Sequence, residues 1–281
     1  MDIYLAKESA YHYIPQVSLE IALDRLEQKK VQLVSGTLGK LISRAKPEDI
    51  NITSVEKRLE AYWQINVRLF TEYERNRTYH IALSGAEIDQ VTILGKELPV
   101  ITDKKDSASL SLEGVEHCVE ESRHEFTFDG EGVEKEMSQY SVYAKTEVLD
   151  FENFAPDDML VVPPKALAST IVRSILSKVI KPVEADVILE ERIDINKLEI
   201  NFRPVYAIEY LWVPKEKQVV LEFDALTGEI LGHGKKIGDQ VKQILTPDLL
   251  FDVSSVAAGA LVPGGGLAVK LIKVAYDQKK N

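Results

Sequence analysis

The sequence has a single cysteine, Cys118, among its 281 residues. An intramolecular disulfide framework is therefore excluded, and the low cysteine content is typical of a reducing compartment. The first eight residues contain no basic segment followed by an apolar core, so no secretory signal is expected there. No uninterrupted apolar run reaches the roughly 20 residues that a membrane-spanning helix needs. These features predict a cytoplasmic protein.

Catalytic motifs are also lacking. The chain has no Cys-x-x-Cys pair, no His-Glu-x-x-His, no P-loop and no Gly-x-Ser-x-Gly elbow, and its five histidines are scattered. The sequence therefore presents neither a nucleophile beside a general base nor a phosphate cradle. We expect no enzymatic activity, no cofactor and no metal. An enzyme whose site is assembled between two halves of the chain is the competing hypothesis.

The negative charge is concentrated in one stretch. The net charge is -11, and residues 101–160 account for all of it, because they contain 16 acidic and 5 basic residues. The absence of clustered Lys and Arg elsewhere argues against a nucleic-acid surface. The acidic stretch could contact a basic partner, but a solvated acidic linker is the simpler interpretation.

Two stretches of the chain, 55–85 and 198–228, are similar to each other. With an offset of 143 positions, Trp63 aligns with Tyr206, and 82–85 aligns with 225–228. An ungapped match of this length predicts a tandem duplication. Trp63 and Tyr206 are then expected in equivalent core positions.

Each half is predicted to be a helix followed by an antiparallel meander, which gives an α+β fold of two related helix-on-sheet halves. The first helix is expected from Ser18 as N-cap to Gly36, and the second follows Pro163. The second helix should carry one apolar stripe, formed by Leu167, Ile171, Ile175, Leu176 and Val179. The strands alternate apolar and polar residues, as a half-buried sheet requires. Hairpin turns are expected at 73–77 and 214–217.

The hairpin turn after residue 223 has recognisable chemistry. Asp224 can accept hydrogen bonds from the backbone N–H groups that follow, Thr227 lies within the turn, and Gly228 can take a positive φ, so the turn should close with a bulge. In the first half, Ser84 and Gly85 take the corresponding positions without the aspartate.

Residues 219–230, Val-Val-Leu-Glu-Phe-Asp-Ala-Leu-Thr-Gly-Glu-Ile, resemble the terminal strands and the Asp-Ala-x-Thr-Gly turn of PepSY domains. The resemblance covers about a quarter of the chain. It implies a helix packed on a small antiparallel sheet over 163–231, and it implies a binding module, because PepSY domains are associated with restraining peptidases and with membrane proteins.

The densest group of potential metal ligands is His117, Cys118, Glu121 and His124. On a helix the two histidines and the glutamate would share a face, and Zn²⁺ accepts all of these side chains. The group lacks a paired-ligand motif and lies in the most acidic region. A solvated polar segment is the alternative, and no metal site is assigned.

The C-terminal segment is apolar and rich in small residues, and it lies beyond the second predicted half. Pro263 and three glycines interrupt it, and a helix is expected from 267 to about 276. We expect this segment to bind a protein partner, with an anionic membrane surface and packing within the chain as alternatives. The residues expected to take part are Val256, Leu261, Val262, Gly264, Gly265, Gly266, Leu267, Lys270, Leu271 and Lys273.

These patterns divide the chain into a first helix-plus-sheet repeat (1–101), an acidic connector (102–160), a second, PepSY-like repeat (161–236) and a helical C-terminal interaction segment (237–281). Together they predict a non-catalytic protein-interaction or regulatory module. A peripheral membrane adaptor acting through 253–281 is the first alternative.

Overall fold

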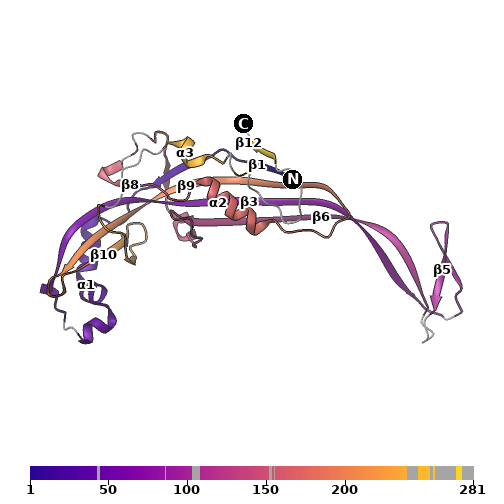
Figure 1. The fold of residues 1–281 in the computed structure, drawn as a ribbon, viewed down its shortest axis with the longest axis horizontal. Helices are drawn as coiled ribbons and strands as arrows, with labels where there is room; N and C mark the ends of the chain where they lie inside the picture. Colours follow the sequence, from indigo (N-terminus) through magenta and orange to yellow (C-terminus); the bar gives the residue numbers. More distant parts are fainter. Residues whose placement is uncertain are drawn as a thin grey trace.

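The computed structural model describes residues 1–42, 45–85, 87–102, 108–151, 154, 156–238, 246–253, 256 and 270–273. The fold is α+β, as predicted. Most of the described chain lies in one large mixed sheet of twelve strands, to which three α-helices are added (Figure 1).

The helices and strands follow a simple order along the chain. The helices are α1 (Leu19–Ile42), α2 (Ala168–Val179) and α3 (Pro247–Phe251). The strands are β1 (Asp2–Leu5), β2 (Ser9–Tyr13), β3 (Ile50–Leu83), β4 (Gln90–Ile93), β5 (Lys96–Thr102), β6 (Ala108–Asp129), β7 (Lys145–Glu147), β8 (Leu160–Val162), β9 (Val187–Trp212), β10 (Lys217–Asp224), β11 (Ile230–His233) and β12 (Lys270–Lys273).

Two long antiparallel strands, β3 and β9, form the centre of the sheet. The main strand order is β11-β10-β9-β3-β6-β5-β4. The outer edge of β9 pairs in turn with β1, β2 and β10, and the outer edge of β3 pairs with β8 and β6. The strands β2 and β8 run parallel to their central neighbours, and each is followed in the chain by a helix.

The main core lies on one face of the sheet. The alternation predicted for β3 is present, because Trp63, Ile65 and Val67 are buried on this face. The apolar stripe predicted for α2 is also buried, and the ring of Phe251 in α3 meets the edge of Trp63. The opposite face carries a smaller cluster formed by Tyr13, Tyr62, Met137, Tyr140 and Leu226.

The strands β3 and β6 continue beyond the rest of the sheet as a two-stranded ribbon. The pairing of β9 with β3 ends at Glu74, whereas β6 pairs with β3 as far as Leu83. The β4–β5 hairpin is attached at the far end of this ribbon (Figure 1). We refer to residues 78–113 as the distal arm. The turn predicted at 73–77 is therefore wrong, because these residues lie within β3.

Three other sequence-based expectations are corrected. The expected acidic connector contains β6, which pairs with β3 over 22 residues and is part of the sheet rather than a linker. The helix expected over 267–276 is wrong for Lys270–Lys273, which form β12 beside β1. The first helix does not end at Gly36, because α1 continues to Ile42. For β6 and β12, pairing with a distant strand overrides the local signal.

Candidate functional site

The turn between β10 and β11 has the predicted hairpin geometry. Asp224 Oδ1 accepts hydrogen bonds from the backbone N–H groups of Leu226 at 2.8 Å and Thr227 at 3.0 Å. Gly228 has φ 76°, and its N–H donates to the Asp224 carbonyl. The pairing of β10 with β11 shifts register after Glu222, which marks the bulge.

A second turn, after β6, is built in the same way. Asp129 Oδ1 accepts from the backbone N–H groups of Glu131 and Val133, both at 3.0 Å. Gly132 has φ 85°, and its N–H donates to the Asp129 carbonyl. Both aspartates follow a buried phenylalanine, Phe128 or Phe223, at the end of a strand.

Both turns are held by the segment that leads into a helix. The carbonyl of Ala225 accepts from the N–H groups of residues 16 and 17 before α1, and the carbonyl of Gly130 accepts from those of residues 165 and 166 before α2. The Tyr206 hydroxyl donates to the Val17 carbonyl at 3.0 Å, and Trp63 Nε1 donates to the Ala166 carbonyl at 2.9 Å. The contacts of the turn at 129–132 thus match those of the turn at 224–228, whereas 82–85, which aligns with 225–228 in sequence, lies elsewhere.

The sequence contained a signal for this second turn. Residues 128–132 read Phe-Asp-Gly-Glu-Gly, and residues 223–228 read Phe-Asp-Ala-Leu-Thr-Gly. The offset between the two aspartates is not 143, because the arm lies between β3 and the turn after β6. In contrast, Ser84 and Gly85 follow the end of β3 in the distal arm.

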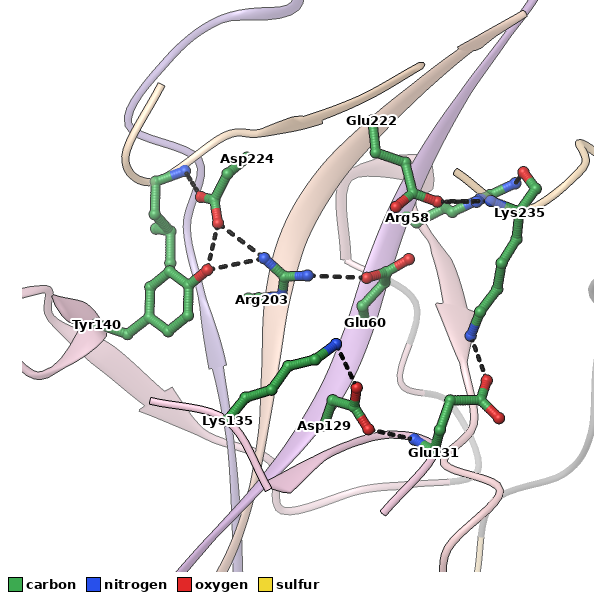
Figure 2. A network of polar contacts seen from close by, with 11 residues as sticks. Arg58, Glu60, Asp129, Glu131, Lys135, Tyr140, Arg203, Glu222, Asp224 and Lys235 are labelled. Carbon is green, nitrogen blue, oxygen red and sulfur yellow. Dashed lines mark hydrogen bonds and ion pairs between the residues drawn. The ribbon is translucent and has the colours of Figure 1, made fainter. Parts of the chain in front are cut away.

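A network of charged side chains joins the two turns on the face of the sheet opposite the main core (Figure 2). At its centre, Arg203 donates to Asp224 at 2.8 Å, to the Tyr140 hydroxyl at 2.7 Å and to Glu60 at 3.1 Å. The Tyr140 hydroxyl in turn donates to Asp224 at 2.5 Å. Burial raises the pKa of Glu60 above its usual value, and the charge of Arg203 partly opposes that rise.

A second arginine, Arg58, is fully buried nearby. It donates to Glu56 at 2.5 Å and Glu222 at 3.1 Å, and to the backbone carbonyls of residues 235 and 236. Lys235 reaches Glu131 beside the second turn at 2.5 Å. A cavity of about 430 Å³ lies against this network. Because these ionised groups are paired with one another, the network stabilises the meeting of the two turns and leaves little charge for a ligand.

A larger cavity, of about 760 Å³, lies beyond the C-terminal end of α2. Thr71 and Tyr73 of β3, Glu120 and Ser122 of β6, and Glu191 of β9 contribute to its lining. The Tyr73 hydroxyl donates to Glu120 at 2.7 Å, and this hydrogen bond raises the pKa of Tyr73 to about 12. The Oε2 atom of Glu191 is buried and has no partner among the described residues.

The predicted metal ligands lie on a strand rather than on a helix. Along β6, His117 and Glu121 point to one face, and Cys118 and His124 point to the other. His117 Nδ1 lies 3.0 Å from Glu74, and Glu121 pairs with Arg68 at 2.8 Å. No group of three or more His, Cys, Asp or Glu side chains in the described part of the chain could hold a metal ion.

The residues predicted to bind a partner are only partly described. Val256 is fully buried in the main core, and its N–H donates to the Val253 carbonyl. Lys270, Leu271 and Lys273 lie in β12. Leu261, Val262, Gly264, Gly265, Gly266 and Leu267 lie outside the described residues. None of the helices described is long and apolar enough to cross a membrane.

Comparisons with known proteins give no family for this chain. No family model matches it, no curated protein is similar to it in sequence, and no solved structure matches its fold.

Proposed function

We propose that the protein is a non-catalytic interaction or regulatory module of the cytoplasm and that it contacts a protein partner through its distal arm. The arm extends away from the rest of the sheet (Figure 1). It carries this proposal because it also exposes large apolar side chains. Tyr79 and Ile81 of β3, Leu94 of the β4–β5 turn and Ile101 of β5 are all exposed. Large apolar side chains that a projecting element exposes to solvent support an interaction surface there.

We also propose that the chain contains an internal repeat, in which the arm is an insertion into the hairpin of the first copy. The two aspartate turns, their matching contacts with the segments before α1 and α2, and the parallel strands β2 and β8 support this interpretation. The repeat unit would then run from a short strand through a helix and a long strand to the turn. Since the second copy has no such arm, the arm would give the first copy a function that the second copy lacks.

The C-terminal segment contributes less to this proposal than the arm does. Val253 and Val256 are buried in the main core, and β12 pairs with β1. These contacts favour packing within the chain over attachment to a partner or a membrane. The PepSY resemblance stays a hypothesis, and it also favours a binding module.

The second candidate is an enzyme that acts at the cavity beside the charged network. The raised pKa of Glu60, at the contact between β3 and β9, is the observation that favours it. Against it, Glu60 is paired with Arg203, and Asp224 and Glu222 also have cationic partners. A Glu60→Gln variant that keeps its partner in the experiment below would argue that this carboxyl is not needed for function.

Site-specific crosslinking tests the proposed function. A photoreactive amino acid placed at Leu94, in the distal arm, should capture a defined protein that mass spectrometry identifies. The control places the same amino acid at Val213, which is exposed and directly follows the end of β9 that lies away from the arm. If both positions capture the same proteins, or neither captures any, the distal arm is not the interaction surface.

An arm-shortened variant gives an independent test. Arg77 and Gly114 are paired in the ribbon, so an Asn-Gly turn can join them and replace residues 78–113. The variant should remain folded and lose the partner identified by crosslinking. A folded variant that retains this partner would refute the proposal.

A further inference from the structure

The strand β6 has a neighbour on only one side along most of its length. It pairs with β3 throughout, and on its other side β5 pairs only with residues 108–110. Among the described residues, no strand covers that side between Ser111 and Phe126. All seven residues from Val119 to Glu125 are exposed. Because their side chains alternate between the two faces of the sheet, exposure of all seven indicates that the edge of the strand is open to solvent.

Hydrogen bonds at the end of β6 establish which backbone groups point outward. The Thr127 carbonyl accepts from Lys135, and the Asp129 N–H donates to Val133, both on the side away from β3. The pairing of β6 with β3 has no register shift, so the odd-numbered residues of β6 point their N–H and C=O groups outward. Val115, Val119 and the other odd-numbered residues from 111 to 125 thus form a template for a further strand.

The charge of this edge selects the kind of strand that can pair with it. Residues 111–125 contain five glutamates and one arginine. Glu116 and Glu121 are paired with Arg75 and Arg68 of β3, which leaves Glu113, Glu120 and Glu125 without a cationic partner among the described residues. A second copy of the chain would bring the same acidic set against the edge, which disfavours pairing between copies at neutral pH. A strand that carries Lys or Arg has the complementary charge.

The larger cavity described above adjoins this edge. Glu120 and Ser122, which line the cavity, belong to β6 itself. Alternate side chains of a strand added beside β6 would lie about 5 Å from these residues. The lining also contains Arg75, Lys178, Lys181 and Arg192, so the cavity itself does not favour a basic side chain. The charge preference comes from the carboxylates along the edge of β6. Backbone pairing with side-chain pockets is the combination by which sheet edges bind peptides.

We propose that the edge of β6 from Ser111 to Glu125 binds an extended, basic peptide segment of a partner protein as an added strand. This inference rests on the proposed function as a binding module, but most of the edge lies nearer the core than the distal arm. The two can therefore fail separately.

Labelled peptides test the proposal on the full chain. The probe is a fluorescein-labelled eight-residue peptide that alternates Lys with Val or Thr. One control peptide has Glu in place of Lys, and another has N-methylated backbone nitrogens at alternate residues. Fluorescence anisotropy should show binding of the basic peptide at least tenfold tighter than that of either control. Hydrogen exchange should show new protection of the outward amides in β6, including those of Val115 and Val119.

Two variants separate backbone pairing from charge. Val119→Pro removes one outward N–H, and edge strands tolerate proline at such positions. Glu113→Lys with Glu125→Lys reverses charge along the edge. Each variant should weaken binding at least tenfold. Glu216→Lys with Glu229→Lys makes the same change in net charge at exposed sites elsewhere and should leave binding within about twofold.

Several results would overturn the proposal. These are equal binding of the acidic peptide, retained affinity in a folded Val119→Pro variant, no binding, or protection located away from β6. A doubling of mass that requires the β6 edge would assign the edge to a second copy instead. If the unmodified protein does not bind the basic peptide but crosslinking at Leu94 still captures a partner, this inference alone is refuted.

Discussion

The two aspartate turns share their local geometry, yet the hairpins that lead to them differ greatly in length. In one hairpin, a short 3-10 helix joins β9 to β10, and Asp224 is the eighth and last residue of β10. In the other, β3 and β6 extend into the arm before the chain returns to Asp129. Among the described residues, the hydrogen bonds that hold the two turns come from the sheet core and from the segments before α1 and α2, and none comes from the arm.

The surroundings of the two turns also differ in burial. Asp224 is fully buried and is bonded to Arg203 and Tyr140, whereas the Asp129 side chain is partly exposed and pairs with Lys135 at 2.6 Å. Partial burial would raise the pKa of Asp129, but the hydrogen bond from Lys135 and the backbone N–H bonds together outweigh it, so the pKa is lowered. The same turn chemistry therefore carries different energetic weight in the two hairpins.

The largest expected effect comes from removing the two aspartates. Asp224→Ala should lower the free energy of unfolding by about 3–5 kcal/mol, because it removes the fully buried carboxylate that Arg203 and Tyr140 share and leaves Arg203 with Glu60 alone. Asp129→Ala should cost only about 1–2 kcal/mol, since mainly the two turn hydrogen bonds are lost. Urea denaturation measures both. Equal losses would show that the buried network adds nothing beyond the turn.

The glycines of the two turns give the next largest effect. Alanine at Gly132 or Gly228 should cost about 1–2 kcal/mol, because both have a positive φ. At Gly132 the new Cβ would also lie 2.8 Å from the Cβ of Ala166, which adds about 1–3 kcal/mol. At Gly228 the nearest atom, at 2.6 Å, belongs to the flexible end of Arg25. Thermal melting should therefore rank Gly132→Ala as the less stable variant.

The β-branched substitution Gly228→Val sharpens this comparison. It should destabilise by more than ~1 kcal/mol, because a branched side chain is costly at positive φ. A melting temperature equal to that of the unmodified protein would mean that the turn at 224–228 does not take this conformation in solution.

Removing the distal arm should have a smaller effect on stability. A two-stranded ribbon is marginally stable by itself, so replacing residues 78–113 with Asn-Gly should change the free energy of unfolding by no more than about 1 kcal/mol. Denaturant unfolding of the full-length and shortened chains measures the difference. A loss of several kcal/mol would show that the arm is an integral part of the core fold.

The smallest effect concerns the pH dependence that Glu60 confers. Because burial raises its pKa in the folded state, its contribution to stability is complete below the ordinary value of 4.5 and is lost as the pH rises through the folded pKa. Relative to Glu60→Gln, the unmodified protein should therefore lose stability as the pH rises above about 4.5. Parallel curves for the two proteins would contradict the raised pKa.

Local patterns predicted some elements well and others poorly. The alternation in β3 and the stripe of α2 were readable, because burial on one face leaves a periodic trace in the sequence. The continuation of β3 through 73–77 was not readable, because Glu, Arg and Asn suggest a turn. Cross-strand pairs stabilise them in an extended conformation instead, including that of Arg75 with Glu116.

The candidate site was less predictable than the fold. His117 and Cys118 were weighed as metal ligands on a helix, but β6 places them on opposite faces of a strand. The Phe-Asp turn at 128–129 was visible in the sequence, but an alignment without gaps could not accommodate the arm. The open edge of β6 had no signal of its own, because an unpaired strand has the same local pattern as a paired one.

The sequence by itself determined the α+β class, the buried faces of β3 and α2, and the chemistry of the turn at Asp224, because each depends on residues close together in the chain. Only the tertiary structure decided that β3 and β9 are neighbours, that Arg58 and Arg203 are neutralised by distant carboxylates, and that the acidic stretch is a strand with an open edge. These features depend on which segments pair across the sheet, and pairing is decided by long-range packing rather than by local preference.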